Sequence, residues 1–260
     1  MSTALPPLRL GTCCPEVGNW QRYLNSRGFR DADGHSLTID ERFGLRTEYA
    51  TENFQRQRDL PVSGSVDLLS RSHACLDGFI PFIQAKYCTL VSPAKPRPLT
   101  LIVIHTMENK EKPSAAEDVA LWFAGLSKMP PPRASAHYCV DEDSVVQCVR
   151  VRDVAWQAEG ANRTGIGIEH AGTAKQSKED WADGASLAIL ARSACLAADL
   201  LREHKIPLRK LTPTEVREGQ SGFCGHYDVN LAFPPTGENH WDPGPSFPWT
   251  DYLAMIQERT

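Results

Sequence analysis

Residues 99–106 read LTLIVIHT, an almost continuous apolar run that carries a histidine near its end. An apolar run of this length without alternation is typical of a strand buried on both faces of a sheet. Residues 165–172, GIGIEHAG, predict a second short buried strand that ends in glycine. The sequence therefore predicts a central sheet with His105 and Glu169 at the ends of buried strands.

Helical patterns alternate with these strands. Residues 114–117, SAAE, form a capping-box pattern ahead of the apolar segment 118–126, and residues 137–151 predict two strands around a polar turn. Residues 185–204 predict the clearest helix, with one apolar stripe made of Leu187, Leu190, Ala194, Ala197 and Leu201. We expect an α/β domain with a mixed central sheet flanked by helices on both faces.

The N-terminal part predicts a small three-helix domain that precedes this α/β domain. Pro15 is expected to open a helix that stops at Gly28, Thr47 to cap a second helix, and Asp67 to cap a third. The segment 92–98, SPAKPRP, contains three prolines and predicts a stiff linker. The expected organisation is a helical domain over residues 1–90, a proline-rich linker over 91–98 and the α/β domain over 99–260.

Composition excludes several classes of function. The 260 residues have a formal net charge of −4, so the chain lacks the basic face that nucleic-acid binding requires. No apolar run reaches the roughly 20 residues that span a bilayer, and no membrane insertion is expected. Because residues 1–20 do not resemble a secretory signal, synthesis in the cytoplasm is expected.

The eight cysteines include no CxxC pair, and we expect them to be reduced and structural. One exception is open. If Asp143 and Ser144 form a two-residue hairpin turn, Cys139 and Cys148 lie opposite each other on the two strands.

Three residues are candidate ligands of a catalytic zinc ion, which needs three protein ligands and one open position for water. His105 ends a buried strand, His226 follows a glycine, and Asp242 lies in a loop rich in proline and glycine. Each has a structural alternative, because a strand-end histidine is often a satisfied core residue and an aspartate before proline is often a turn residue. Cys224, as a fourth ligand, would close the site and make it structural.

Six segments in order resemble the type 2 N-acetylmuramoyl-L-alanine amidases, over about residues 99–249. They are IVIHTM (102–107), ASAHYCVD (134–141), AWQAEG (155–160), GIGIEHAG (165–172), GHYDV (225–229) and HWDPGPSFPW (240–249). The resemblance implies the type 2 amidase fold, with Zn²⁺ held in an open groove by His105, His226 and Asp242. It also implies hydrolysis of the amide between the lactyl group of N-acetylmuramic acid and L-alanine in peptidoglycan.

The resemblance also suggests two catalytic residues. Glu169 matches the glutamate that assists the attacking water, and Ala136 stands where other branches carry a tyrosine for this role. A carboxylate at the end of an apolar strand is unfavourable unless it has a polar task. His240 stands where many members carry a lysine that stabilises the oxyanion. The structural alternatives are that backbone donors satisfy Glu169 and that His240 only lines the groove.

The substrate-binding residues implied by the resemblance are Trp156, Asn162 and Arg163, in the loop before the Glu169 strand. We group His137 with this site in a supporting or structural role rather than as a metal ligand. Gln157 stands where many members carry a histidine, which leaves the details of the loop open.

The N-terminal part resembles the peptidoglycan-binding domain found beside many wall hydrolases, over about residues 12–76. The matching segments are WQRYL (20–24), IDERFGLRT (39–47) and ENFQRQRDLPVSG (52–64), and the segment SGSVDLLS (63–70) is an imperfect second copy of the turn in DERFGLRT (40–47). A generic three-helix bundle is the alternative.

Together these features predict a bacteriolytic zinc amidase, expected to be a phage endolysin that is made in the host cytoplasm and degrades the cell wall during host cell lysis. A bacterial wall-recycling enzyme and a secreted autolysin are alternatives with the same chemistry. A non-catalytic peptidoglycan-binding protein on the same fold is the runner-up, and a zinc-stabilised structural protein of a phage particle is a third possibility.

Overall fold

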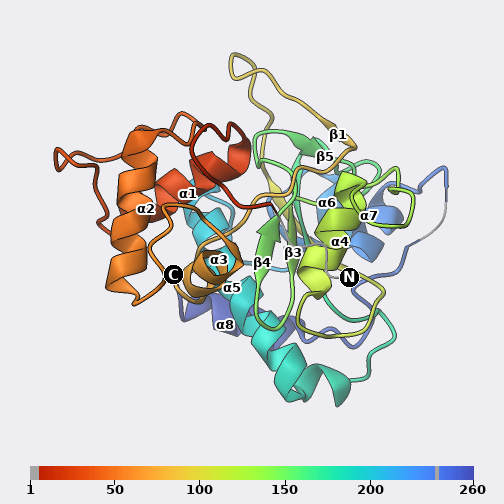
Figure 1. Ribbon diagram of the computed structural model, residues 1–260. Helices are drawn as coiled ribbons and strands as arrows, with labels where there is room; N and C mark the ends of the chain where they lie inside the picture. Colours follow the sequence, from red (N-terminus) through yellow and green to blue (C-terminus); the bar gives the residue numbers. More distant parts are fainter. Residues whose placement is uncertain (1–5, 238–239) are drawn as a thin grey trace. The chain divides into compact units, whose positions relative to one another are not determined.

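A computed structural model gives the arrangement of the chain and describes residues 6–237 and 240–260 (Figure 1). The chain divides into two compact units, Met1–Phe82 and Ile83–Thr260. The border therefore lies before the expected one at residue 90. The reason is that Ile83 and Ala85 donate backbone hydrogen bonds to the carbonyls of Gln147 and Cys148, within the second unit.

The first unit contains the three helices predicted from the sequence: α1 Pro15–Ser26, α2 Leu45–Gln57 and α3 Leu68–Leu76. Asp67 caps α3, since its side chain accepts a hydrogen bond from the Ser70 backbone N–H. The prediction that Thr47 caps α2 is wrong, because Gly44 is the N-cap. Thr47 is buried inside the first turn, where its hydroxyl accepts a hydrogen bond from Gln21.

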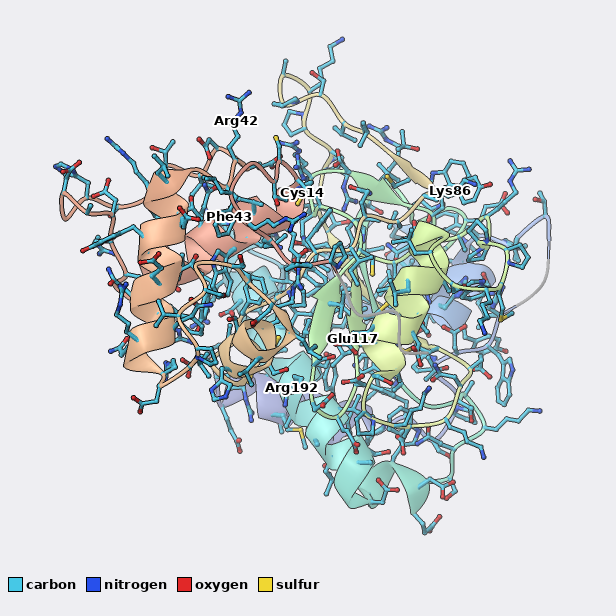
Figure 2. The ribbon with its side chains drawn as sticks, in the orientation of Figure 1. Cys14, Arg42, Phe43, Lys86, Glu117 and Arg192 are labelled. Carbon is cyan, nitrogen blue, oxygen red and sulfur yellow. The ribbon has the colours of Figure 1, made fainter. Side chains whose placement is uncertain are left out.

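Aromatic side chains form the core of the first unit. Trp20 meets Phe54 edge to face with ring centroids 5.3 Å apart, and its indole N–H donates to the Thr51 hydroxyl at 2.9 Å. Phe43 joins this core, whereas its neighbour Arg42 extends into solvent (Figure 2). Burial of such large rings supplies most of the favourable free energy available to a unit of this size.

Two buried glutamines hold the turns that precede α2 and α3. The Gln21 Oε1 atom accepts the backbone N–H groups of Asp40 and Glu41. In the same way, Gln55 Oε1 accepts those of Ser63 and Gly64, both at 3.0 Å. The two turn-like segments seen in the sequence are therefore two copies of one device, a glutamine amide that closes a turn.

The second unit is built on a five-stranded mixed sheet of order β4-β3-β6-β2-β7, which confirms the predicted fold class. Its strands are β2 Leu101–Thr106, β3 Tyr138–Val140, β4 Val145–Gln147, β6 Gly165–His170 and β7 Gly222–Gly225. β2 pairs in parallel with β6 on one side and with β7 on the other, so the apolar run 99–106 is an inner strand. A small second sheet pairs β1 Cys88–Thr89 with β5 Val154–Ala155.

Helices cover both faces of this sheet. They are α4 Ala115–Ala124, η1 Asp180–Ala182 (a 3-10 helix), α5 Gly184–His204, α6 Pro213–Arg217, α7 His226–Ala232 and α8 Trp249–Gln257. α5 and α8 pack together on one face, where Ser193 links His170 of β6 to Tyr252 through two 2.7 Å contacts (Figure 1). On the other face, Leu101 and Val103 pack against Val229 of α7. This second face carries the site described below.

α5 is long and apolar enough to cross a membrane by length and composition, but it packs along the sheet as a core helix does. The buried face of α5 differs from the predicted stripe at one end. Leu187 is 44% exposed, while Ile189 and Ser193 are buried. The buried face of α5 is rotated from the predicted stripe because α8 and β6 both pack against the helix. The apolar pattern of the helix alone does not indicate where those partners lie.

Tertiary contacts also replace two local features that the sequence predicts. Ser114 makes no capping hydrogen bond, and the Asp141 carboxylate, from the turn between β3 and β4, accepts the Ala116 N–H at 2.9 Å instead. That turn spans residues 141–144, because Val140 pairs with Val145. Cys139 consequently lies opposite Val146 rather than Cys148, although the two buried Sγ atoms are only 3.7 Å apart.

The segment predicted as a linker belongs to the second unit. The Arg97 guanidinium is buried and donates to the carbonyls of Val151, Arg163 and Gly165. Burial lowers the pKa of Arg97 to about 10, and the nearby Asp153 carboxylate partly offsets this effect. Because one side chain ties the segment to two loops and to β6, residues 91–98 do not act as a spacer between the units.

Candidate metal centre and groove

The three candidate zinc ligands converge, although they come from distant parts of the chain. His105 lies at the end of β2, His226 begins α7, and Asp242 lies in the loop before α8. The Asp242 carboxylate oxygens lie 3.0 Å from His105 Nδ1 and 3.2 Å from His226 Nδ1. All three side chains are buried, and their ligand atoms lie within 4.8 Å of one another.

Backbone hydrogen bonds fix this convergence. Ile104 of β2 pairs with Gly225 of β7, so that His226 follows beside the end of β2. The Tyr227 N–H then donates to the Asp242 carbonyl at 3.0 Å, which ties the loop to the first turn of α7. Gly225 is required here because a Cβ at this position would lie 2.6 Å from Pro243 Cδ.

The donor set fits a zinc ion. Two imidazole nitrogens and one carboxylate are a ligand set of catalytic zinc sites, in which tetrahedral geometry at about 2.1 Å places ligand atoms roughly 3.4 Å apart. Cys224 does not join them, because its side chain belongs to the apolar cluster under α7 and burial raises the pKa of its thiol. Among the described residues, His105, His226 and Asp242 thus offer three ligand atoms, the number that a catalytic zinc site takes from the protein.

The charges within the cluster are strongly coupled. Burial raises the pKa of Asp242, but hydrogen bonds from His105 and His226 outweigh it and hold this pKa well below its usual range. Burial lowers the pKa of His105, and the hydrogen bond to Asp242 with the charge of Glu169 reverses this to about 9. Burial lowers the pKa of His226, whose neighbours include two other histidines. A bound cation would compete with protons for the same ligand atoms.

Glu169 lies beside the cluster. It pairs with His105 across the parallel strands β6 and β2, so both side chains point to the same face of the sheet. Burial raises the pKa of Glu169 to about 8, and the charge of His105 only partly opposes this. Its Oε2 atom is buried without a hydrogen-bond partner among the described residues. The structural alternative, a glutamate satisfied by backbone donors, finds no support at this oxygen.

His240 lies at the open side of the cluster. Its ring stacks on that of His226 with centroids 4.7 Å apart, and its Nδ1 atom lies 3.9 Å from the Asp242 carboxylate. Asn230, one turn along α7 from His226, donates to the His240 carbonyl at 2.6 Å. The His240 side chain is 55% exposed, so it can meet a molecule that reaches His226.

A groove of about 400 Å³ opens beside His226 and His240. Trp156 and Asn162, two of the predicted substrate-binding residues, line it. The Trp156 indole N–H donates to the Thr89 hydroxyl at 3.0 Å, which orients the ring. Asn162 shapes the loop, since its Oδ1 atom accepts the backbone N–H groups of Gln157 and Ala158.

The other two predicted substrate-binding residues do not line this groove. His137 is fully buried, and its Nδ1 atom accepts the Gly167 N–H at 3.0 Å. Burial and the neighbouring Arg97 lower the pKa of His137 to about 3, so it stays neutral. This geometry gives His137 a structural task at β6. Arg163 is exposed, and its carbonyl accepts a hydrogen bond from Arg97.

Sequence reasoning missed several residues that line the groove, namely Arg133, Glu159 and Asn230. Arg133 directly precedes the segment ASAHYCVD, so its position beside a recognised motif was an available signal. Glu159 accepts hydrogen bonds from the backbone N–H and the hydroxyl of Thr236, which lies 77 residues later in the chain. Such a contact between distant loops has no signature in a single sequence.

Comparisons with known proteins identify the families that the two parts of the chain match. The profile of the family described as N-acetylmuramoyl-L-alanine amidase matches residues 95–245, and that of a putative peptidoglycan binding domain matches residues 15–69. N-acetylmuramoyl-L-alanine amidase A of Achromobacter lyticus is 28% identical over 165 residues, which are 60% of this chain and 81% of the relative.

Two solved structures are similar at low identity. The hydrolase AmiA of Staphylococcus aureus, in complex with its ligand, has a TM-score of 0.47 and 18% identity, over 73% of this chain and 88% of that one. The N-acetylmuramoyl-L-alanine amidase LysC from Clostridium intestinale has a TM-score of 0.44 and 16% identity, over 68% of this chain and 97% of that one.

Proposed function

Because the chain belongs to the N-acetylmuramoyl-L-alanine amidase family, we propose that it hydrolyses peptidoglycan with a zinc ion held by His105, His226 and Asp242. The bond to be cut is the amide between the lactyl group of N-acetylmuramic acid and L-alanine of the stem peptide. The observation that carries the proposal is the convergence of two imidazole nitrogens and one carboxylate beside a groove.

Bound zinc would supply Lewis acidity, which lowers the pKa of a water molecule from 15.7 to about 7 and polarises a carbonyl group. Glu169 would take the proton of the attacking water; its buried Oε2 atom, which has no hydrogen-bond partner among the described residues, and its pairing with His105 across the sheet support this role. As the C–N bond breaks, Glu169 returns this proton to the nitrogen of L-alanine. His240 donates a hydrogen bond to the carbonyl oxygen as negative charge develops on it.

The groove offers a binding surface for the glycan and peptide. Trp156 presents an aromatic ring that is held by Thr89 and lies 5.7 Å from the ring of Tyr87. An immobilised aromatic ring binds a sugar face with little loss of side-chain entropy. Arg133 lines the same groove and carries a guanidinium that suits a carboxylate of the stem peptide.

The first unit is proposed to hold the enzyme on the wall. The match of residues 15–69 to a peptidoglycan binding domain supports this role. A wall-binding unit beside an amidase unit also suits a lytic enzyme, and we propose a phage endolysin that is made in the host cytoplasm and reaches the wall at lysis. The non-catalytic alternative is disfavoured because all three ligand residues are present and converge.

One digestion separates these possibilities. Purified peptidoglycan is incubated with the full chain, with and without a chelator, and new L-alanine amino groups and free lactyl groups are measured. We expect both products to appear in equal amounts, and to disappear with chelation and in an Asp242→Ala variant that binds no zinc. Reducing sugar ends would indicate a glycosidase, and release of nothing would indicate a binding protein.

A further inference from the structure

We propose that Gln157 is a positioning residue that selects the metal-binding tautomer of His105. The Gln157 Oε1 atom lies 3.1 Å from His105 Nε2, while His105 Nδ1 faces Asp242 at 3.0 Å. Gln157 therefore holds the ring nitrogen that points away from the ligand cluster. The inference rests on the proposed function, because it concerns how this chain prepares one ligand for the zinc ion.

The tautomer decides whether His105 can bind a metal ion at all. A neutral imidazole carries its proton on only one nitrogen, and the other nitrogen must present its lone pair to the metal. A proton on Nδ1 would be donated to Asp242 and would block the site. An amide oxygen only accepts hydrogen bonds, so Gln157 Oε1 places the proton on Nε2 and leaves Nδ1 free for the ion.

The fold provides a slot for this side chain. Gly165 and Gly167 lie on the same face of β6 as Glu169, and neither has a side chain to fill the space. A Cβ at Gly167 would lie 2.0 Å from Gln157 Oε1, and one at Gly165 would lie 2.9 Å from Gln157 Nε2. The two glycines of GIGIEH are thus explained by the amide that packs over them.

The backbone of Gln157 is fixed independently of its side chain. Asn162 Oδ1 accepts the N–H groups of Gln157 and Ala158, each at 2.8 Å. From this backbone the side chain extends over Gly165 and Gly167, where a turn about its terminal bond would exchange its oxygen and its nitrogen. The Nε2 atom of Gln157 is buried without a partner among the described residues, so no other observed contact sets the orientation of the amide. The observed orientation places Oε1 against His105 Nε2, and this oxygen favours the tautomer with the proton on Nε2.

A neutral acceptor suits this site because two carboxylates already face His105. Asp242 Oδ2 lies 3.0 Å from His105 Nδ1, and Glu169 is paired with His105 across β6 and β2, so a third carboxylate would add further negative charge. An amide instead orients the ring without adding charge. The Gln157 side chain thereby orients His105 without changing the charge of the site. A zinc ion together with the Asp242 carboxylate would keep a net charge of about +1.

The test is zinc affinity, measured on the full metal-free chain by competition with a chromophoric chelator. Gln157→Met keeps a similar length and removes the acceptor, and we expect it to weaken zinc binding about 10- to 100-fold. Gln157→Glu restores an acceptor and should bind within a few-fold of the wild type. Gln84→Met, the same change at an exposed position of the second unit, is the matched control and should bind as the wild type does. Unchanged affinity in Gln157→Met would overturn the proposal.

A second measurement does not depend on a variant that folds. Nitrogen-15 spectra of histidine in the zinc-loaded wild type report which ring nitrogen carries the proton. We expect His105 to be protonated at Nε2 and bound through Nδ1, and the reverse assignment would overturn the role of Gln157. If the wild type bound no zinc, the proposed function itself would fail, whereas zinc binding that is insensitive to Gln157 would remove only this inference.

Discussion

The two units of the chain use glutamine amides in opposite ways. In the first unit, Gln55 is fully buried, its oxygen accepts two backbone N–H groups, and its nitrogen donates to the Ser65 carbonyl and the Ser70 hydroxyl. In the second unit, Gln157 contacts His105 through its oxygen and leaves its buried nitrogen without a partner among the described residues. The first amide completes its hydrogen bonds within the fold, and the second does not.

The same contrast extends to the carboxylates. Glu16 in the first unit is buried but paired with Arg71, with Oε1 2.9 Å from the Arg71 Nε atom. Glu169 in the second unit is half-buried, and its buried Oε2 atom has no hydrogen-bond partner among the described residues. Unsatisfied buried polar atoms reduce stability, and the unpaired atoms of Gln157 and Glu169 both belong to side chains beside His105, where an interaction with metal or substrate can complete them. Among these four side chains, the two with complete hydrogen bonds lie in the first unit, and the two with an unpaired atom lie beside His105.

The largest expected effect is that of Asp242→Ala. This change removes a ligand and the residue that joins the two histidines, so zinc binding and amide hydrolysis should both be lost, hydrolysis by at least about 10³-fold. Binding of the chain to intact peptidoglycan, measured by co-sedimentation, should remain because the first unit is unchanged. Zinc-dependent hydrolysis near the wild-type rate in Asp242→Ala would contradict the assignment of the metal site to the second unit.

Glu169→Gln should come next. The change keeps the shape of the side chain but removes its ability to take a proton, and kcat should fall by roughly 10²- to 10⁴-fold. Zinc content, measured on the purified protein, should stay at the wild-type value. We also expect no loss of thermal stability, because burial disfavours the charged carboxylate in the folded chain. A destabilised protein with normal kcat would instead assign Glu169 a structural task.

Gln55→Ala tests the opposite half of the comparison. It leaves the Ser63 and Gly64 N–H groups without their acceptor and should lower the free energy of unfolding of the first unit by about 1–3 kcal/mol. Chemical denaturation of the full chain should show the loss, while zinc affinity stays constant. If Gln55→Ala also weakened zinc binding, the stability of the first unit and the zinc affinity of the second would be coupled. Gln57→Ala, at an exposed position of the same helix, serves as the control.

The smallest effect is expected at the edge of the groove. Glu159→Ala removes the hydrogen bonds to Thr236, which are exposed and worth about 1 kcal/mol in total. KM for peptidoglycan fragments should rise a few-fold while kcat is unchanged, because the reacting groups are not touched. Steady-state kinetics would contradict this assignment if kcat fell and KM did not change.

The parts of this account that the sequence predicted share a physical cause. The strand at 99–106 was predictable because burial on both faces leaves an uninterrupted apolar run. The convergence of His105, His226 and Asp242 was predictable only through the ordered motifs around them, since no single histidine or aspartate is distinctive. Their distances from one another depend on the register of β2 with β7, which no local pattern encodes.

The parts that the sequence did not predict depend on partners far along the chain. Ser114 has a capping pattern, but Asp141 makes the cap because the turn after β3 reaches α4. Arg97 lies in a proline-rich segment, and only the folded loops reveal the carbonyls that it binds. Gln157 departed from the expected residue type, and its contact with His105 becomes visible only when β2 and the loop are brought together. In each case a tertiary contact outweighs a local preference.

The central claim is that three converging side chains hold one catalytic zinc ion, and a titration tests it most directly. Metal-free protein receives zinc in steps, and the release of L-alanine amino groups from peptidoglycan is measured at each step. We predict that activity rises linearly and reaches a plateau at one zinc ion per chain. Full activity before any zinc is added, or no activity at saturation, would contradict the account.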